Sequence, residues 1–130
     1  MIKSINPSTG QLIKEYNLYS DDKVLSILNN VSSAYTSWRD TSFKERSQVL
    51  FNVADTLTSN LEQHARMISL EIGKPISESK MEIEKCVWVL KYFAENAKDF
   101  LKQDTIITDY QESYVQYDPL GTILGIMPWN

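Results

Sequence analysis

Residues 121–130 read Gly-Thr-Ile-Leu-Gly-Ile-Met-Pro-Trp-Asn, "GTILGIMPWN", and this stretch decides the predicted fold. Its first seven residues are apolar except for Thr122, and polar side chains do not alternate with apolar ones. Such a run predicts a strand buried on both faces, and strands of that kind belong to parallel sheets covered by helices. A parallel sheet needs further strands joined by crossover helices. We therefore expect an α/β protein that continues beyond this first strand.

The residues before this stretch are predicted to be mainly helical after a short N-terminal hairpin. The hairpin is "INPSTGQLIKEYNL", in which residues 7–10 supply the turn. Apolar side chains then recur at helical spacing in four segments. The residues expected to begin these helices are Ser20, Ser42 in a capping box with Glu45, Asn60 with Gln63, and Pro75 after the helix-closing Gly73.

The last and longest of these helices is expected from about residue 76 to 101. Its apolar stripe is widened by Trp88, Tyr92 and Phe93, which predicts core side chains and packing on more than one side. After Gln103 the pattern becomes strand-like in "TIIT" (105–108) and "ESYVQYD" (112–118), where alternation suits a half-exposed antiparallel pair. The expected division is a hairpin and helical part (1–103), a strand pair (104–120) and a truncated sheet strand (121–130).

Composition excludes several classes of protein. The formal net charge of -4 argues against a nucleic-acid partner, because phosphates would be repelled. No run of about 18 apolar residues is present, so no membrane span is predicted. The first ten residues lack the apolar stretch of a signal peptide. A single cysteine fits a reducing compartment, and the expected location is cytoplasmic.

Most candidate reactive groups are better explained as structural. Cys86 lies within an apolar helix without a nearby histidine or helix N-terminus, which predicts a buried, slow thiol and not a nucleophile. His64 is the only histidine, and no cysteine or carboxylate pair stands at ligand spacing, so no metal site is expected. The four glycines are scattered and form no phosphate-binding loop.

Asn130 is the strongest candidate for chemistry. An asparagine at the end of a buried parallel strand lies at the carboxyl edge of the sheet, where α/β proteins place ligands. Its amide could donate a hydrogen bond to a developing oxyanion, or it could simply belong to a turn that follows the strand. The residues alone leave both readings open.

The order of four motifs resembles the aldehyde dehydrogenase family. They are "INPSTGQLI", "LEIGKPISES", "EIEKCVWVLKYFAENA" and "YDPLG" followed by "GTILGIMPWN", and together they cover essentially the whole chain. The third is most similar to the succinate-semialdehyde dehydrogenase group. The resemblance corresponds to the N-terminal quarter to third of a typical member and implies the α/β fold of that family.

The resemblance also implies a reaction and a set of site residues. A cysteine thiolate attacks an aldehyde, hydride passes to NAD or NADP, and a glutamate activates the water that releases the carboxylic acid. Asn130 matches the asparagine that stabilises the oxyanion. Residues 126–129 (Ile126, Met127, Pro128 and Trp129) match a strand end that binds the coenzyme mostly through backbone atoms. The catalytic cysteine and glutamate would lie beyond Asn130, so this fragment is expected to be inactive.

The resemblance assigns the partners as well. The strands around residues 114–118 are similar to an arm that pairs with a neighbouring subunit, which implies a homo-oligomer, a dimer or a tetramer. The substrate would be a small-molecule aldehyde. Two other classes remain as alternatives, a non-catalytic helical assembly module and a small domain that binds a peptide along its exposed strands.

Overall fold

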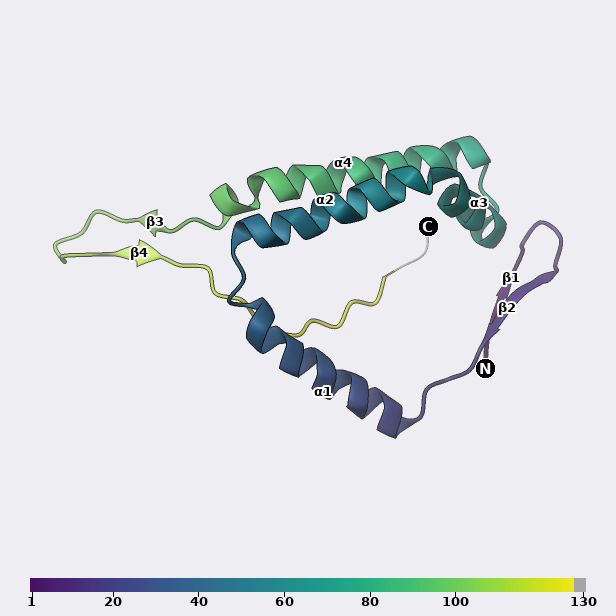
Figure 1. Cartoon of the computed structure of the whole chain (residues 1–130), viewed down its shortest axis with the longest axis horizontal. Helices are drawn as coiled ribbons and strands as arrows, with labels where there is room; N and C mark the ends of the chain where they lie inside the picture. Colours follow the sequence, from purple (N-terminus) through teal and green to yellow (C-terminus); the bar gives the residue numbers. More distant parts are fainter. Residues whose placement is uncertain (128–130) are drawn as a thin grey trace.

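The computed structural model describes residues 1–127 (Figure 1). Helices dominate the described part, with one strand pair before them and one after. In chain order the elements are β1 (Ile2–Ile5), β2 (Leu12–Tyr16), α1 (Asp21–Trp38), α2 (Phe43–Ser59), α3 (Leu61–Ile72), α4 (Ile76–Phe100), β3 (Asp104–Thr105) and β4 (Tyr114–Val115). The predicted hairpin, the four helices and the later antiparallel pair are all confirmed.

The core lies where α4 packs along α2 and over α3 (Figure 1). Its buried apolar side chains are small apart from one isoleucine: Ala54, Ala65, Ile83 and Ala94. Alanines at the crossing points let the helix backbones approach closely. The contact between α2 and α4 also includes a hydrogen bond, in which the Ser47 hydroxyl donates to the Ala94 carbonyl at 2.5 Å. The packing of α2 on α4 therefore forms the rigid part of the described chain.

The four predicted helix starts are confirmed, and two of them carry a side-chain cap. The Ser20 hydroxyl accepts from the Lys23 amide, and Ser42 forms the complete capping box with Glu45. Asn60 was predicted to begin α3, and it is the N-cap residue of that helix, although its side chain makes no capping hydrogen bond. Its backbone serves both the end of α2 and the start of α3, and its side-chain amide turns back to donate to the Thr56 carbonyl at 2.9 Å.

Removing the cap at Ser42 should destabilise the chain in a pH-dependent way. Ser42→Ala is expected to lower the free energy of unfolding by about 1 kcal/mol, a typical N-cap value. Hydrogen bonds from the Ser42 hydroxyl and then its backbone amide lower the pKa of Glu45. A depressed folded-state pKa stabilises the fold above the unfolded-state pKa, and this contribution disappears as pH falls through the folded-state pKa. Urea unfolding at neutral and acidic pH measures both effects.

The matched control is Ser33→Ala, which removes an exposed hydroxyl within α1. In acid, the difference in stability between Ser42→Ala and the unchanged chain should shrink. A difference that stayed constant across pH would show that Glu45 takes no part in the cap.

Gly73 ends α3 in the left-handed conformation, with φ 82°, as predicted. The N-terminal hairpin packs against this corner, because a Cβ added to Gly73 would lie 2.9 Å from the Pro7 Cγ. The Ser4 hydroxyl also donates to the Glu71 carboxylate at 2.6 Å. The turn of the hairpin and the end of α3 therefore fit together only while residue 73 lacks a side chain.

The second strand pair is shorter than predicted. Only Asp104–Thr105 and Tyr114–Val115 pair, in antiparallel register, and the ribbon projects away from the helices (Figure 1). The intervening residues 106–113 form its loop. We call residues 104–117 the ribbon from here on.

The predicted buried strand at the end of the chain is not seen as a strand. Residues 121–127 have no assigned strand, and their large side chains are exposed, including Ile123 at 74% and Leu124 at 85%. The physical reason is that a strand exists only through hydrogen bonds to a neighbour, and no element within residues 1–127 pairs with this segment.

Of the helices in the described part, none has the length and apolar composition that a membrane crossing needs.

Candidate functional site

The predicted site falls at the edge of the described chain. Ile126 and Met127 lie in the unpaired segment, and each side chain is 85% exposed. Pro128, Trp129 and Asn130 lie outside the described residues. Of the four residues predicted to contact the coenzyme, the two that the structure describes are therefore exposed, and no other part of residues 1–127 covers them.

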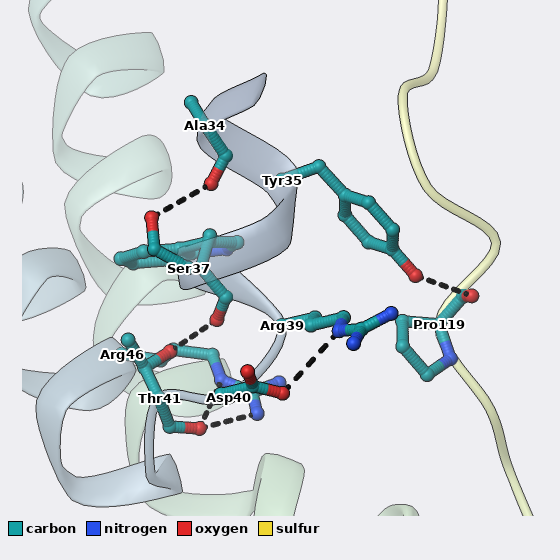
Figure 2. Close-up of polar contacts among 9 residues, drawn as sticks. Ala34, Tyr35, Ser37, Arg39, Asp40, Thr41, Arg46 and Pro119 are labelled. Carbon is teal, nitrogen blue, oxygen red and sulfur yellow. Dashed lines mark hydrogen bonds and ion pairs between the residues drawn. The ribbon is translucent and has the colours of Figure 1, made fainter. Parts of the chain in front are cut away.

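The segment leading to this site is held by one residue of α1. The Tyr35 hydroxyl donates to the Pro119 carbonyl at 3.1 Å, across 84 positions of sequence (Figure 2). Gly121 follows with φ 102°, and a Cβ placed there would lie 3.9 Å from the Tyr35 ring. Tyr35 is half-buried, although α1 has no fully buried residue. The contact therefore joins α1 to the chain at the point where it leaves the ribbon.

The end of α1 is in turn fixed to α2 through a tight corner (Figure 2). The Thr41 hydroxyl donates to the Trp38 carbonyl at 2.6 Å. The Arg46 guanidinium donates to the Thr41 carbonyl through Nη2 at 2.6 Å and through Nε at 3.2 Å. Trp38 also lines an apolar cavity of about 250 Å³ with side chains of α2 and α4. These contacts set the direction in which α1 leaves the core.

Cys86 was predicted to be buried, and this was wrong, because the structure exposes it on α4. The face of α4 that meets α2 and α3 carries Ile83 and Ala94, and Cys86 lies to the side of that stripe. No group of three or more histidine, cysteine or acidic side chains within residues 1–127 could hold a metal ion.

The aromatic residues of α4 were predicted to lie in the core, and they are half-exposed. Trp88 is 63% exposed and stacks on Tyr92 with ring centroids 5.8 Å apart. Phe93 and Phe100, at 48% and 50% exposure, complete the cluster through edge contacts. Helical spacing identified one apolar face, but it could not show that the alanines, and not the rings, occupy the helix crossings.

Comparison with known proteins identifies the family. Residues 1–130 match the aldehyde dehydrogenase family over the full length of the chain. The chain belongs to this family. Its predicted fold class is confirmed as well, since the solved structures that resemble it are aldehyde dehydrogenases.

Three aldehyde dehydrogenase relatives illustrate the likeness. The probable succinate-semialdehyde dehydrogenase (NADP+) of Synechocystis sp. is 35% identical over 129 residues, which cover 99% of this chain and 28% of the relative. Succinate-semialdehyde dehydrogenase (NADP+) 1 of Mycobacterium tuberculosis is 36% identical over 132 residues, which cover 99% of this chain and 29% of the relative. The succinate semialdehyde dehydrogenase (NAD(P)+) of Escherichia coli is 33% identical over 127 residues, which cover 98% and 28%. The chain therefore spans less than a third of these aldehyde dehydrogenases.

Two solved structures agree with the aldehyde dehydrogenase fold. The succinic semialdehyde dehydrogenase of Streptococcus pyogenes, solved with NADP+, matches with a TM-score of 0.81 and 25% identity, over 86% of this chain and 25% of that chain. An NAD-dependent aldehyde dehydrogenase of Sinorhizobium meliloti matches with a TM-score of 0.73 and 30% identity, over 81% and 21%.

Proposed function

We propose that this chain forms part of an NAD(P)-dependent aldehyde dehydrogenase that oxidises succinate semialdehyde to the dicarboxylic acid. The observation that carries the proposal is the similarity, at 33–36% identity over nearly the whole chain, to relatives named for that activity. All three names specify NADP+ or both coenzymes, which favours NADP as a coenzyme alongside NAD.

The segment before Asn130 fits a role in coenzyme binding. Ile126 and Met127 are 85% exposed, and no strand within residues 1–127 pairs with their backbone. Their amide and carbonyl groups are therefore free of sheet contacts to that part of the chain. We assign them, together with Pro128 and Trp129, to backbone contacts with NAD or NADP. When bound, the nicotinamide of the coenzyme accepts a hydride.

Asn130 is assigned to the oxyanion that forms when a thiolate attacks the aldehyde carbonyl. A side-chain amide held in place at that position donates a hydrogen bond to charge that develops only during the reaction. Cys86 is the only cysteine of the 130 residues, and it lies on the exposed side of α4. We therefore propose that the attacking thiolate and the general-base glutamate come from outside these residues.

We also propose a homo-oligomer, a dimer or a tetramer, that assembles through the ribbon. Two-stranded ribbons are marginal on their own, and their open edges are templates for another strand. This ribbon exposes large apolar side chains as well, with Ile107 at 99% and Tyr110 at 82%. A second copy of the chain would cover both features.

A substrate and coenzyme panel tests the proposed reaction. The protein that contains this chain should form NADPH or NADH with succinate semialdehyde, with a kcat/KM at least about tenfold higher than with butanal. The carboxylate of succinate semialdehyde, which butanal lacks, offers a charge-assisted hydrogen bond, and about 1.4 kcal/mol corresponds to tenfold. Absorbance of the reduced coenzyme is the measurement. Equal kcat/KM for the two aldehydes would remove succinate semialdehyde from the proposal and leave only a general aldehyde dehydrogenase.

The 130-residue chain alone is the negative control of this panel. It should form no reduced coenzyme with either aldehyde, because the nucleophile and the base are proposed to lie elsewhere. Turnover by the chain alone, abolished by deleting Asn130, would contradict that assignment.

A further inference from the structure

We propose that the aromatic face of α4 is an internal packing surface, covered by the remaining part of the same enzyme chain and not by a second subunit. This face consists of Trp88, Tyr92, Phe93 and Phe100. The inference rests on the proposal that this chain is part of a larger aldehyde dehydrogenase, and it is independent of the substrate assigned to that enzyme.

The first step is that α4 uses only one of its apolar sides within residues 1–127. The side with the buried Ile83 and Ala94 packs on α2 and α3. Another side carries Trp88 at 63% exposure and, one turn later, Tyr92 at 41%. A helix that is apolar on more than one side is typical of the core of a larger protein. The sequence of α4 therefore provides for burial on a second side.

The second step is that the rings already form one ordered surface. Trp88 stacks on Tyr92, with centroids 5.8 Å apart. Tyr92 meets Phe93 edge-on at 5.5 Å and Phe100 in a tilted contact at 5.9 Å. Stacked and edge contacts are the arrangements that aromatic pairs prefer. Because the rings hold one another in place, a segment that packs on them has few side-chain rotamers left to immobilise.

The third step is that the exposed area suits packing within one chain. The four residues are 41–63% exposed. At about 200 Å² for each aromatic side chain, their exposed part amounts to roughly 400 Å². A stable interface between two subunits needs about 800 Å² from each partner. A segment of the same polypeptide needs less area, because its packing does not cost the translational and rotational freedom of a separate molecule.

The fourth step concerns the chain that would supply the cover. The 130 residues span less than a third of the relatives they match, so a protein of that length has most of its polypeptide outside them. The ribbon, which we assign to a second copy, projects away from the helices (Figure 1). Trp88 and Tyr92 each have a polar end that needs a hydrogen-bond partner when the ring is covered. We therefore expect an apolar segment that also offers an acceptor to the indole N–H of Trp88.

Hydroxyl-radical modification of the full-length protein, read by peptide mass spectrometry, tests whether the face is covered. We expect Trp88 and Tyr92 to react roughly tenfold more slowly than the same residues in a proteolytic digest, because a covered ring reacts only during local opening. A ring that stayed 63% exposed, as Trp88 is in this chain, would react within about twofold of the digest, and that result would overturn the proposal. The measurement needs no turnover, so it can fail while the proposed reaction stands, and the reverse.

Dilution separates the enzyme's own chain from a second subunit as the cover. Protection should be the same above and below the concentration at which sedimentation velocity shows dissociation. Trp88→Gln should also leave the dissociation constant within about twofold of that of Glu84→Gln, a matched control that places glutamine at an exposed position of α4 one turn earlier. Protection lost on dilution, or a dissociation constant raised about tenfold by Trp88→Gln alone, would assign the face to a second subunit and overturn the proposal.

Discussion

Replacing Asn130 with alanine in the enzyme that contains this chain should lower kcat by about 10²–10³ while leaving the affinity for NADP nearly intact. The reason is that the amide serves a charge that exists only after the thiolate has attacked the carbonyl. An interaction made only in the transition state contributes to kcat and not to ground-state binding. Losing one such donor typically costs about 2.7–4 kcal/mol of barrier.

The coenzyme should still bind to Asn130→Ala because the contacts assigned to residues 126–129 are backbone contacts, which the substitution leaves in place. Steady-state kcat and NADPH titration separate the two quantities. Asn30→Ala is the matched control, since Asn30 is exposed on α1. A variant with normal kcat and strongly weakened coenzyme binding would make Asn130 a coenzyme ligand or the end of a strand. This choice is the one that the sequence leaves open.

Much of the fold could be predicted because its signals are local. A serine cap with a glutamate three residues on, a glycine at a helix end and a proline at the next start each act within one turn of the chain. Ser42, Gly73 and Pro75 accordingly stand where they were predicted. Asn60 also stands at the predicted start of α3, but it ends α2 as well, and its side-chain amide donates to the Thr56 carbonyl of that earlier helix.

Burial was predicted less well because it depends on which helices meet. Periodicity marked α4 as broadly apolar, which placed Cys86 and Trp88 inside. Ile83 and Ala94, which lie on the apolar stripe that the sequence predicts for this helix, are buried, whereas Cys86 and Trp88 are exposed. The segment 121–127 shows the same limit, since its apolar run predicts a strand whose pairing partners are not among the described residues.

The residues of the candidate site also differ in how well the sequence could predict them. Asn130 and residues 126–129 were found from a contiguous motif, and only a family resemblance gave them roles. Tyr35 carried no such signal, because its contact partner Pro119 lies 84 positions away and is met through a backbone carbonyl. Only the folded structure brings Tyr35 and Pro119 together.

Placing a charge on the ribbon should dissociate the proposed oligomer. Ile107→Asp is expected to raise the dissociation constant by roughly 30-fold or more, since losing an interface anchor costs about 2 kcal/mol or more. Ile107 is 99% exposed in this chain, so the substitution removes no contact within the described residues and should leave the fold intact. Sedimentation velocity across a concentration series measures the shift towards smaller species.

Leu18→Asp provides the comparison, because it puts the same charge on an apolar side chain that is 68% exposed and outside the ribbon. Tyr114→Asp tests the paired strand itself, since Tyr114 lies opposite Thr105 in the antiparallel register. If the ribbon is the interface, both ribbon variants should dissociate at concentrations where Leu18→Asp remains assembled. If the oligomer persisted in both ribbon variants, the interface would have to lie outside the ribbon. The exposed isoleucine and the open strand edges would then need a partner other than a second copy of this chain.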